Sequence, residues 1–167
     1  MKRWQRMFRH FSTLPWQVRR AFSPPVLQAI EQAIVASELH HSGEVRFAVE
    51  GSLDWLPLLR GCTARQRALA LFGQLGVWDT AQNTGVLVYV LYAERRIEIV
   101  ADRGIAAKVP QAEWDAICND MRSAFRAGRY QQGASEGLQR ITALLAAHFP
   151  PAADGNPDEL PNRVVFL

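Results

Sequence analysis

The sequence predicts an α/β fold, a three-layer α/β/α sandwich with a small mixed sheet of three or four strands. Three observations support this prediction. Residues 84–92 (TGVLVYVLY) are apolar on both faces, which is typical of a central strand that is covered on both sides. Helical and strand patterns alternate along the chain. About thirty residues, which include a helix, join the first two strands, and such a connection favours parallel strands.

The first half of the chain predicts a helix, a strand and a loop. Ser23 is a suitable N-cap, and apolar residues repeat at helical spacing after it, so we expect a helix over 23–41. Apolar and polar residues then alternate over 44–50, which predicts the first strand. Residues 51–62 contain proline and glycine, and we expect them to form a loop.

A capping box and a short turn define the elements around the central strand. Thr63 and Gln66 have the spacing of a capping box, which predicts a helix that ends at Gly76. The strand expected over 96–102 follows the central strand after a very short turn. These two strands therefore form an antiparallel hairpin.

Two further helices complete the predicted domain. Pro110 opens the first, and Gly128 and Gly133 separate it from the second. The chain thus divides into three parts: a basic amphipathic N-terminal arm (1–22), an α/β domain (23–150) and a proline-rich C-terminal tail (151–167).

The composition is that of one ordinary globular domain. The chain has 167 residues, of which 49% are hydrophobic and 21% charged, and a domain of this length needs neither disulfides nor a metal to fold. No run approaches the roughly 20 apolar residues of a spanning helix, and the charged N-terminal segment lacks the apolar core of a signal peptide. Cys62 and Cys118 form no CxxC pair. We therefore expect a cytoplasmic protein with reduced thiols.

Positive charge is concentrated at the N-terminus. Residues 1–20 contain six basic residues and no acidic one, whereas the whole chain carries a net charge of +3. Without that segment, 13 basic and 16 acidic residues remain, a net charge of −3. Nucleic-acid binding requires basic residues along a face of the domain, so this distribution argues against a nucleic-acid partner.

The same N-terminal segment has the pattern of a basic amphipathic helix. Its apolar residues recur at helical spacing with basic residues between them: Trp4, Met7, Phe8, Phe11 and Leu14. Pro15 is expected to end this helix. In one interpretation, the apolar stripe packs on the domain while the arginines stay in water. In the other, the helix lies on the anionic surface of the inner membrane as a peripheral contact.

Common catalytic and metal-binding motifs are absent from the sequence. It contains no GxxxxGK[ST] phosphate loop, no GxGxxG, no HExxH and no GxSxG. His40 and His41 are adjacent, so on a helix their side chains point about 100° apart and do not chelate one ion together. Cys118 falls in the apolar stripe of a helix, where an inert buried thiol is expected.

One edge of the predicted sheet collects oxygen-bearing side chains. Given the strand directions, the first strand begins there at Glu44, the second begins after 79–84, and the third ends at Asp102. The candidate metal ligands are Asp79, Thr80, Asn83 and Asp102, with Arg103 beside them. Hard oxygen ligands suit calcium or magnesium, and a metal with an arginine can hold a phosphate. In the alternative interpretation, the same residues cap turns.

The opposite edge, where parallel sheets usually bind ligands, offers charged turn residues without a convergent pattern. These residues are Glu50, Gly51, Glu94, Arg95 and Arg96. We therefore predict the functional site at the first edge.

Four segments carry a resemblance to a known family. They are LGVWDTAQNTGVLVYVLYAERRIEIVADRGI (75–105), the following helix with Trp114, FRAGRYQQG (125–133) and HFP (148–150). Over residues 23–161 the chain resembles the TPM domain family, in particular its bacterial cytosolic branch. The resemblance implies an α/β/α sandwich, phosphatase activity as linked to plant members or calcium binding as linked to some bacterial ones, and a LemA-type membrane-associated protein as partner.

The resemblance also implies site residues. The matching positions are Asp79, Thr80, Asn83, Asp102, Arg103 and Gly104, and a further matching stretch (SELHHSGEVRF) contributes Glu38, His41 and Glu44. The chain departs from the family at Ala81, where an acidic residue is common, at Thr84, where a second asparagine is common, and in NPDELP, which has an insertion. The missing oxygen donor at position 81 counts against calcium binding and more strongly against phosphatase activity.

These observations favour a non-catalytic or weakly catalytic domain without an organic cofactor. We expect a divalent-cation or small-anion site at the first edge and a protein partner near the inner membrane. One alternative is a metal-assisted phosphomonoesterase that uses Asp79 and Asp102. Another is a structural adaptor that docks on anionic membrane through residues 1–20.

Overall fold

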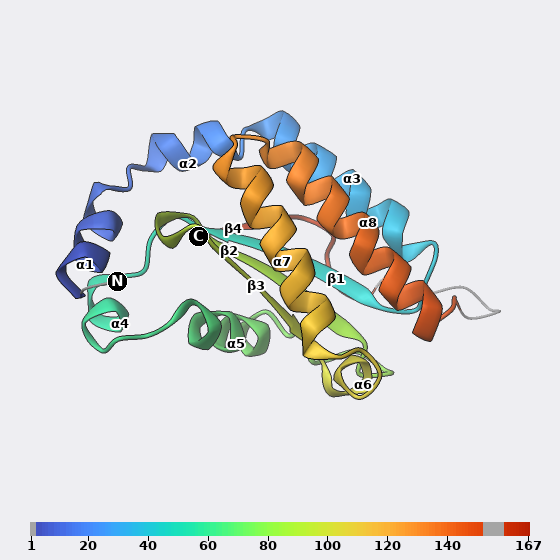
Figure 1. Cartoon of the computed structure of the whole chain (residues 1–167). Helices are drawn as coiled ribbons and strands as arrows, with labels where there is room; N and C mark the ends of the chain where they lie inside the picture. The colour runs from blue at the N-terminus through green and yellow to red at the C-terminus, as the bar shows by residue number, and fades with distance from the viewer. Residues whose placement is uncertain (1–2, 152–158) are drawn as a thin grey trace.

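The computed structural model of the chain describes residues 3–151 and 159–167. Its centre is a four-stranded mixed sheet in the order β3-β2-β1-β4 (Figure 1). The strands are β1 (Glu44–Glu50), β2 (Gly85–Leu91), β3 (Arg96–Ala101) and β4 (Val165–Phe166). β1 runs parallel to β2 and β4, and β2 runs antiparallel to β3. The predicted α/β class, parallel pair and hairpin are thus confirmed.

Helices cover both faces of this sheet (Figure 1). One face carries α3 (Pro24–Glu38), α7 (Gln111–Arg126) and α8 (Tyr130–His148), and the other carries α5 (Ala64–Gln74). Alternate residues of β2 enter the two hydrophobic cores, with Val88 on the side of α7 and α8 and Tyr89 on the side of α5. Each of the seven residues of β2 is buried, as expected for a strand covered on both faces.

The predicted loop over 51–62 contains a short helix, α4 (Trp55–Leu59). Asp54 occupies its N-cap position, and Pro57 is its third residue. The first turn of a helix has no internal partner for its N–H groups, so a proline there removes no hydrogen bond. The proline that suggested a loop is therefore compatible with a helix.

The N-terminal arm forms two helices, α1 (Arg3–Ser12) and α2 (Pro15–Ala21). The first ends before Pro15, as predicted, but Pro15 also begins the second, in the position where its fixed φ favours a helix. Val18 and Ala21 of α2 are buried in the core beside α7 and α8. The arm is therefore packed on the domain through α2.

Gly133 lies inside α8, whereas the sequence predicted a helix break there. A Cβ at Gly133 would lie 2.6 Å from the Cβ of Ala124 in α7, and one at Gly137 would lie 2.5 Å from the sulfur of Met121. These glycines allow α7 and α8 to approach closely. Gly128, with φ of +76°, does follow the end of α7.

The C-terminal tail returns to the sheet. Residues 152–158 of this tail, and with them the first part of NPDELP, lie outside the described residues. Leu160 is buried in the core beside α5, and β4 pairs with Ala48 and Val49 of β1. The last residues thus supply the fourth strand.

Candidate functional site

The edge of the sheet that was predicted to hold the site does bring remote segments together. Glu44 begins β1 opposite Gly85, which begins β2. The backbone N–H of Asp102, after β3, donates to the carbonyl oxygen of Gly85 at 2.9 Å. A Cβ at Gly85 would lie 1.8 Å from the carbonyl oxygen of Val77, so this crossing requires glycine. We call this region, formed by Glu44, residues 79–84 and Asp102–Arg103, the oxygen-rich edge.

Asp102 and Arg103 connect the end of β3 to the loop before β2. Asp102 is the N-cap of α6 (Arg103–Ala106), and its Oδ1 accepts from the N–H of Arg103 at 2.6 Å. The Oδ2 atom of Asp102 is buried without a hydrogen-bond partner among the described residues. Arg103 Nε donates to Asn83 Oδ1 at 3.0 Å, and Asn83 itself has a left-handed backbone with φ of +55°.

The loop before β2 places Asp79 and Thr80 differently. Thr80 is buried, and its Oγ1 accepts from the N–H of Thr84 at 2.9 Å. Asp79 is exposed, and its side chain makes no hydrogen bond with a described residue. Thr80 therefore has a structural contact, whereas the carboxylate of Asp79 is accessible.

Glu159 lies at the oxygen-rich edge, and the sequence did not predict it there. Its Oε2 accepts from the backbone N–H of Ala81 at 2.9 Å, across 78 residues of sequence. The tail thus brings a carboxylate to the loop before β2. The described part of the chain contains no group of three or more Asp, Glu, His or Cys residues that could hold a metal ion. Metal binding by Asp79, Thr80, Asn83 and Asp102 stays a prediction.

Glu38 and Glu44 hold backbone groups around the start of β1. Glu38 Oε1 accepts from the N–H of Val45 at 3.1 Å. Glu44 is fully buried, and its Oε2 accepts from the N–H of Leu160 at 3.2 Å, which attaches the tail to the sheet. These contacts give both carboxylates a structural role.

His41 is also fully buried. Its Nδ1 accepts from the N–H of Gly43 at 3.2 Å, so the proton of the neutral ring is on Nε2, which lies 2.8 Å from Ser37 Oγ. Burial lowers the pKa of His41 to about 4, and the ring is therefore neutral at pH 7. Both ring nitrogens are used by neighbouring groups.

The opposite edge of the sheet holds a pocket of about 400 Å³, contrary to the expectation that no residues converge there. The positively charged residues that line it are Arg9, Arg95, Arg96, Arg122 and Arg126. We call it the arginine pocket. Its arginines come from α1, from α7, from the turn between β2 and β3 and from the start of β3, so no local sequence motif indicates it.

Helix α1 is attached to the domain by its ionic face. Arg6 Nε and His10 Nε2 contact the same oxygen of Glu94, at 2.6 and 2.9 Å, in the turn between β2 and β3. His10 Nδ1 accepts from the N–H of Leu53 at 3.0 Å, so its Nε2 carries the proton. Burial raises the pKa of Glu94, but the hydrogen bonds from His10 and Arg6 bring it below its usual value.

Most of the apolar stripe of α1 faces water, although Met7 is half-buried. Trp4, Phe8 and Phe11 are 66%, 69% and 67% exposed. This contradicts the interpretation in which the stripe packs on the domain while the arginines stay in water. The reason is the buried carboxylate of Glu94, which binds Arg6 and His10 and thereby turns the other face outward.

Comparison with known proteins identifies the family. The sequence matches the profile of the TPM domain over residues 19–144. The chain belongs to the TPM domain family. The NMR structure of the BA42 protein from the psychrophilic bacterium Bizionia argentinensis is 30% identical, with a TM-score of 0.76 over 87% of this chain and 94% of that one.

A second solved structure shares the fold of this TPM domain. The N-terminal domain of a protein from P. gingivalis is 22% identical, with a TM-score of 0.62 over 76% of this chain and 78% of that one. A search of curated proteins finds no match. In the described ranges, 3–151 and 159–167, no helix has both the length and the apolar character needed to cross a bilayer.

Proposed function

We propose that this TPM domain is a non-catalytic module that docks on an anionic membrane surface through α1 and α4. The observation that carries the proposal is the orientation of α1, whose ionic face contacts the domain while its aromatic face is in water. A surface helix of a soluble domain normally has the reverse orientation. Neighbouring exposed aromatic side chains of this kind are typical of an interaction site.

The aromatic surface continues from α1 onto α4. Arg3 Nη2 donates to the carbonyl oxygen of Leu59 at 2.5 Å, which joins the two helices. Trp55 of α4 is 64% exposed, and Leu56 and Leu59 are also exposed. Both helices lie together at one end of the molecule, away from α8 (Figure 1). This surface is accessible to a flat partner.

Charge favours a lipid bilayer as that partner. Residues 1–20 contain no acidic residue, and Arg3 and Arg9 are exposed on α1. Each basic residue near an anionic leaflet adds about 1 kcal/mol of attraction, and tryptophan favours the interfacial region. Docking on the inner membrane would also place the domain beside the LemA-type protein expected as its partner.

Cosedimentation with vesicles tests this proposal. The domain is expected to sediment with vesicles that contain phosphatidylglycerol, to stay in solution with pure phosphatidylcholine, and to dissociate as salt is added. In the variant Trp4→Ala/Phe8→Ala/Phe11→Ala, binding should fall by roughly tenfold or more, because each buried ring contributes at least about 1 kcal/mol.

Trp78→Ala is the matched control, because Trp78 is 55% exposed but lies at the oxygen-rich edge, in the loop before β2. Its vesicle binding should equal that of the unmodified chain. If the triple variant binds vesicles as well as the unmodified chain does, the membrane proposal is wrong. The unmodified chain could instead bind a LemA-type protein but no vesicle. If the triple variant then loses binding to that protein, the surface is a protein interface.

A divalent-cation site at the oxygen-rich edge is a second candidate function, which the buried Oδ2 of Asp102 supports. A buried carboxylate oxygen without a partner is unfavourable, and a cation would satisfy it. Asp79 is exposed in the loop before β2, and Glu159 reaches the same loop. The ion that these oxygens would suit is calcium or magnesium.

A calcium titration followed by amide NMR tests the cation site. We expect saturable shifts at Asp79, Asn83 and Asp102 in the unmodified chain and their loss in Asp102→Asn. Asparagine also caps helices, so this variant should retain its fold with a stability change below about 1 kcal/mol. If calcium shifts no amide at this edge, or shifts them equally in the variant, the cation proposal fails.

A further inference from the structure

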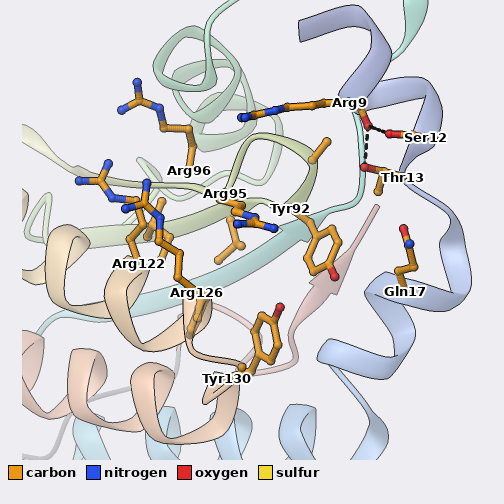
Figure 2. Close-up of a pocket in the computed structure, with 15 residues that line it drawn as sticks. Arg9, Ser12, Thr13, Gln17, Tyr92, Arg95, Arg96, Arg122, Arg126 and Tyr130 are labelled. Atoms are coloured by element: carbon orange, nitrogen blue, oxygen red, sulfur yellow. Dashed lines mark hydrogen bonds between the residues drawn. The ribbon is translucent and has the colours of Figure 1, made fainter. Parts of the chain in front are cut away.

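The arginine pocket gathers positive charge from distant parts of the chain. Arg9 comes from α1, Arg95 comes from the turn between β2 and β3, Arg96 is the first residue of β3, and Arg122 and Arg126 come from α7. Figure 2 shows the side chains of Arg122 and Arg126 extending side by side from α7, with Arg9 reaching across from α1. Because Arg122 and Arg126 are four residues apart on a helix, they lie on the same face. The positive charges thus converge on one space.

The acidic residue that is nearest in sequence to Arg95 and Arg96 does not neutralise the arginines of the pocket. Glu94 directly precedes Arg95 and Arg96 in the sequence, but Arg6 and His10 contact its carboxylate. Because α1 is attached in this way, Glu94 pairs with α1 and not with the arginines of the pocket. The same attachment brings Arg9 to the pocket. None of the described residues that line the pocket is acidic.

The surrounding charges leave the pocket positive. Glu98 interacts electrostatically with Arg96 and Arg122 from outside the lining. The other three arginines form no ion pair with a described residue. Like charges held together repel, so a bound anion stabilises this arrangement.

The backbone at Arg95 also points to a functional role. Arg95 has φ of +52° and ψ of +42°, the left-handed conformation that disfavours side chains. Glycine would be the favourable residue at this position. Strained residues of this kind cluster at functional sites, which fits a role for the guanidinium of Arg95 in the pocket.

Aromatic rings line the rest of the pocket. Tyr92 and Tyr130 stack with their ring centroids 6.4 Å apart, and Phe125 packs on Tyr130 with its centroid 5.2 Å away. The Tyr92 and Tyr130 hydroxyls point toward each other (Figure 2). A volume of about 400 Å³ exceeds that of a phosphate ion alone. A ligand of this pocket therefore has room for an organic group beside its charge.

We infer that the arginine pocket binds a phosphorylated organic anion, a phosphate monoester. Guanidinium groups pair with phosphate oxygens through two parallel hydrogen bonds, so a lining with five arginines suits a phosphate group. The tyrosine rings contact the organic part of the ligand. The monoester is either a free molecule or the headgroup of a lipid such as phosphatidic acid. This inference does not rest on the membrane proposal, since a soluble ester would bind without vesicles.

Phenyl phosphate is a suitable soluble probe. Calorimetric titration of the full chain is expected to show saturable binding that weakens as salt is added and that is tighter than the binding of inorganic phosphate. Amide shifts should appear at Arg95, Arg126 and Tyr130. The variant Trp4→Ala/Phe8→Ala/Phe11→Ala should retain this binding, which separates the pocket from the membrane-docking surface.

Two arginine variants and one control test whether phenyl phosphate binds in the arginine pocket. Arg95→Gly suits the left-handed backbone, so its unfolding midpoint should be unchanged or higher, while phenyl phosphate binding weakens by about tenfold or more. Arg126→Gln should weaken binding to a similar extent. Arg129→Gln removes the same charge at an exposed residue outside the pocket lining, and its affinity should stay within about twofold of the unmodified chain.

Vesicles distinguish the two sources of the phosphate. Preference for phosphatidic acid over phosphatidylglycerol at equal surface charge, lost in Arg95→Gly, would assign the pocket to a lipid headgroup. Binding of phenyl phosphate without that preference would assign it to a free ester. The inference is overturned if phenyl phosphate and phosphatidic acid do not bind. It is also overturned if they bind but Arg95→Gly and Arg126→Gln do not weaken that binding.

Discussion

An aspartate in place of Val88 is expected to unfold the domain. Val88 is fully buried in β2, where it lies opposite Phe47 of β1 and Ile99 of β3. The buried residues of the core cluster around it are hydrophobic. An unpaired carboxylate at this position costs roughly 3–5 kcal/mol, a large share of the 5–15 kcal/mol that stabilises a typical domain. The amide NMR spectrum of Val88→Asp should lose its dispersion.

Leu69→Asp is the matched control for this substitution. Leu69 lies on α5 and is 51% exposed, so the same chemical change leaves the new carboxylate in water. Its urea midpoint should correspond to a loss of at most about 1 kcal/mol. A folded Val88→Asp with a midpoint near that of Leu69→Asp would mean that β2 is not covered on both faces.

The elements that the sequence predicted correctly have local signals. The apolar run over 84–92 identifies β2 without reference to the rest of the chain, and the short turn after it fixes the hairpin. The capping box of Thr63 and Gln66 marks the start of α5 and is formed as expected. Each of these patterns depends on residues only a few positions apart.

The orientation of α1 had no such signal. Periodicity identified the helix and its apolar stripe, but it contains no information on which face meets the domain. That choice depends on Glu94, which is 88 residues from Arg6 and 84 from His10. An ion pair formed only in the folded chain therefore reversed the expected orientation.

The two edges of the sheet show the same limit. Strand direction predicted that Glu44 and Asp102 share an edge, because the direction of paired strands follows from their connections. It did not predict Glu159, which reaches that edge from the tail. The arginine pocket at the opposite edge combines α1, α7 and a turn, and their packing together is a property of the tertiary structure.

A second large loss of stability is expected when Arg67 is replaced by methionine. Arg67 of α5 contacts Glu50 through two nitrogens at 2.9–3.1 Å, and the hydroxyl of Tyr89 donates to Glu50 at 2.5 Å. The side chain of Glu50 is only 8% exposed, at the end of β1. Burial, with the hydrogen bond to Glu50, raises the pKa of Tyr89, so its hydroxyl stays protonated as a donor. Arg67→Met leaves a buried carboxylate without its counter-charge, and urea unfolding should report a loss of about 3 kcal/mol.

The double variant Arg67→Met/Glu50→Gln tests whether the uncompensated charge of Glu50 causes the loss of stability in Arg67→Met. Glutamine has the shape of Glu50 and can still accept the Tyr89 hydroxyl through its amide oxygen, but it has no charge that needs a partner. If the buried charge is responsible, the double variant should recover more than half of the stability lost in Arg67→Met, and the cycle should give a coupling of about 1–3 kcal/mol. If the double variant is as unstable as Arg67→Met, the arginine instead stabilises the domain through the packing of its aliphatic stem between α5 and the sheet.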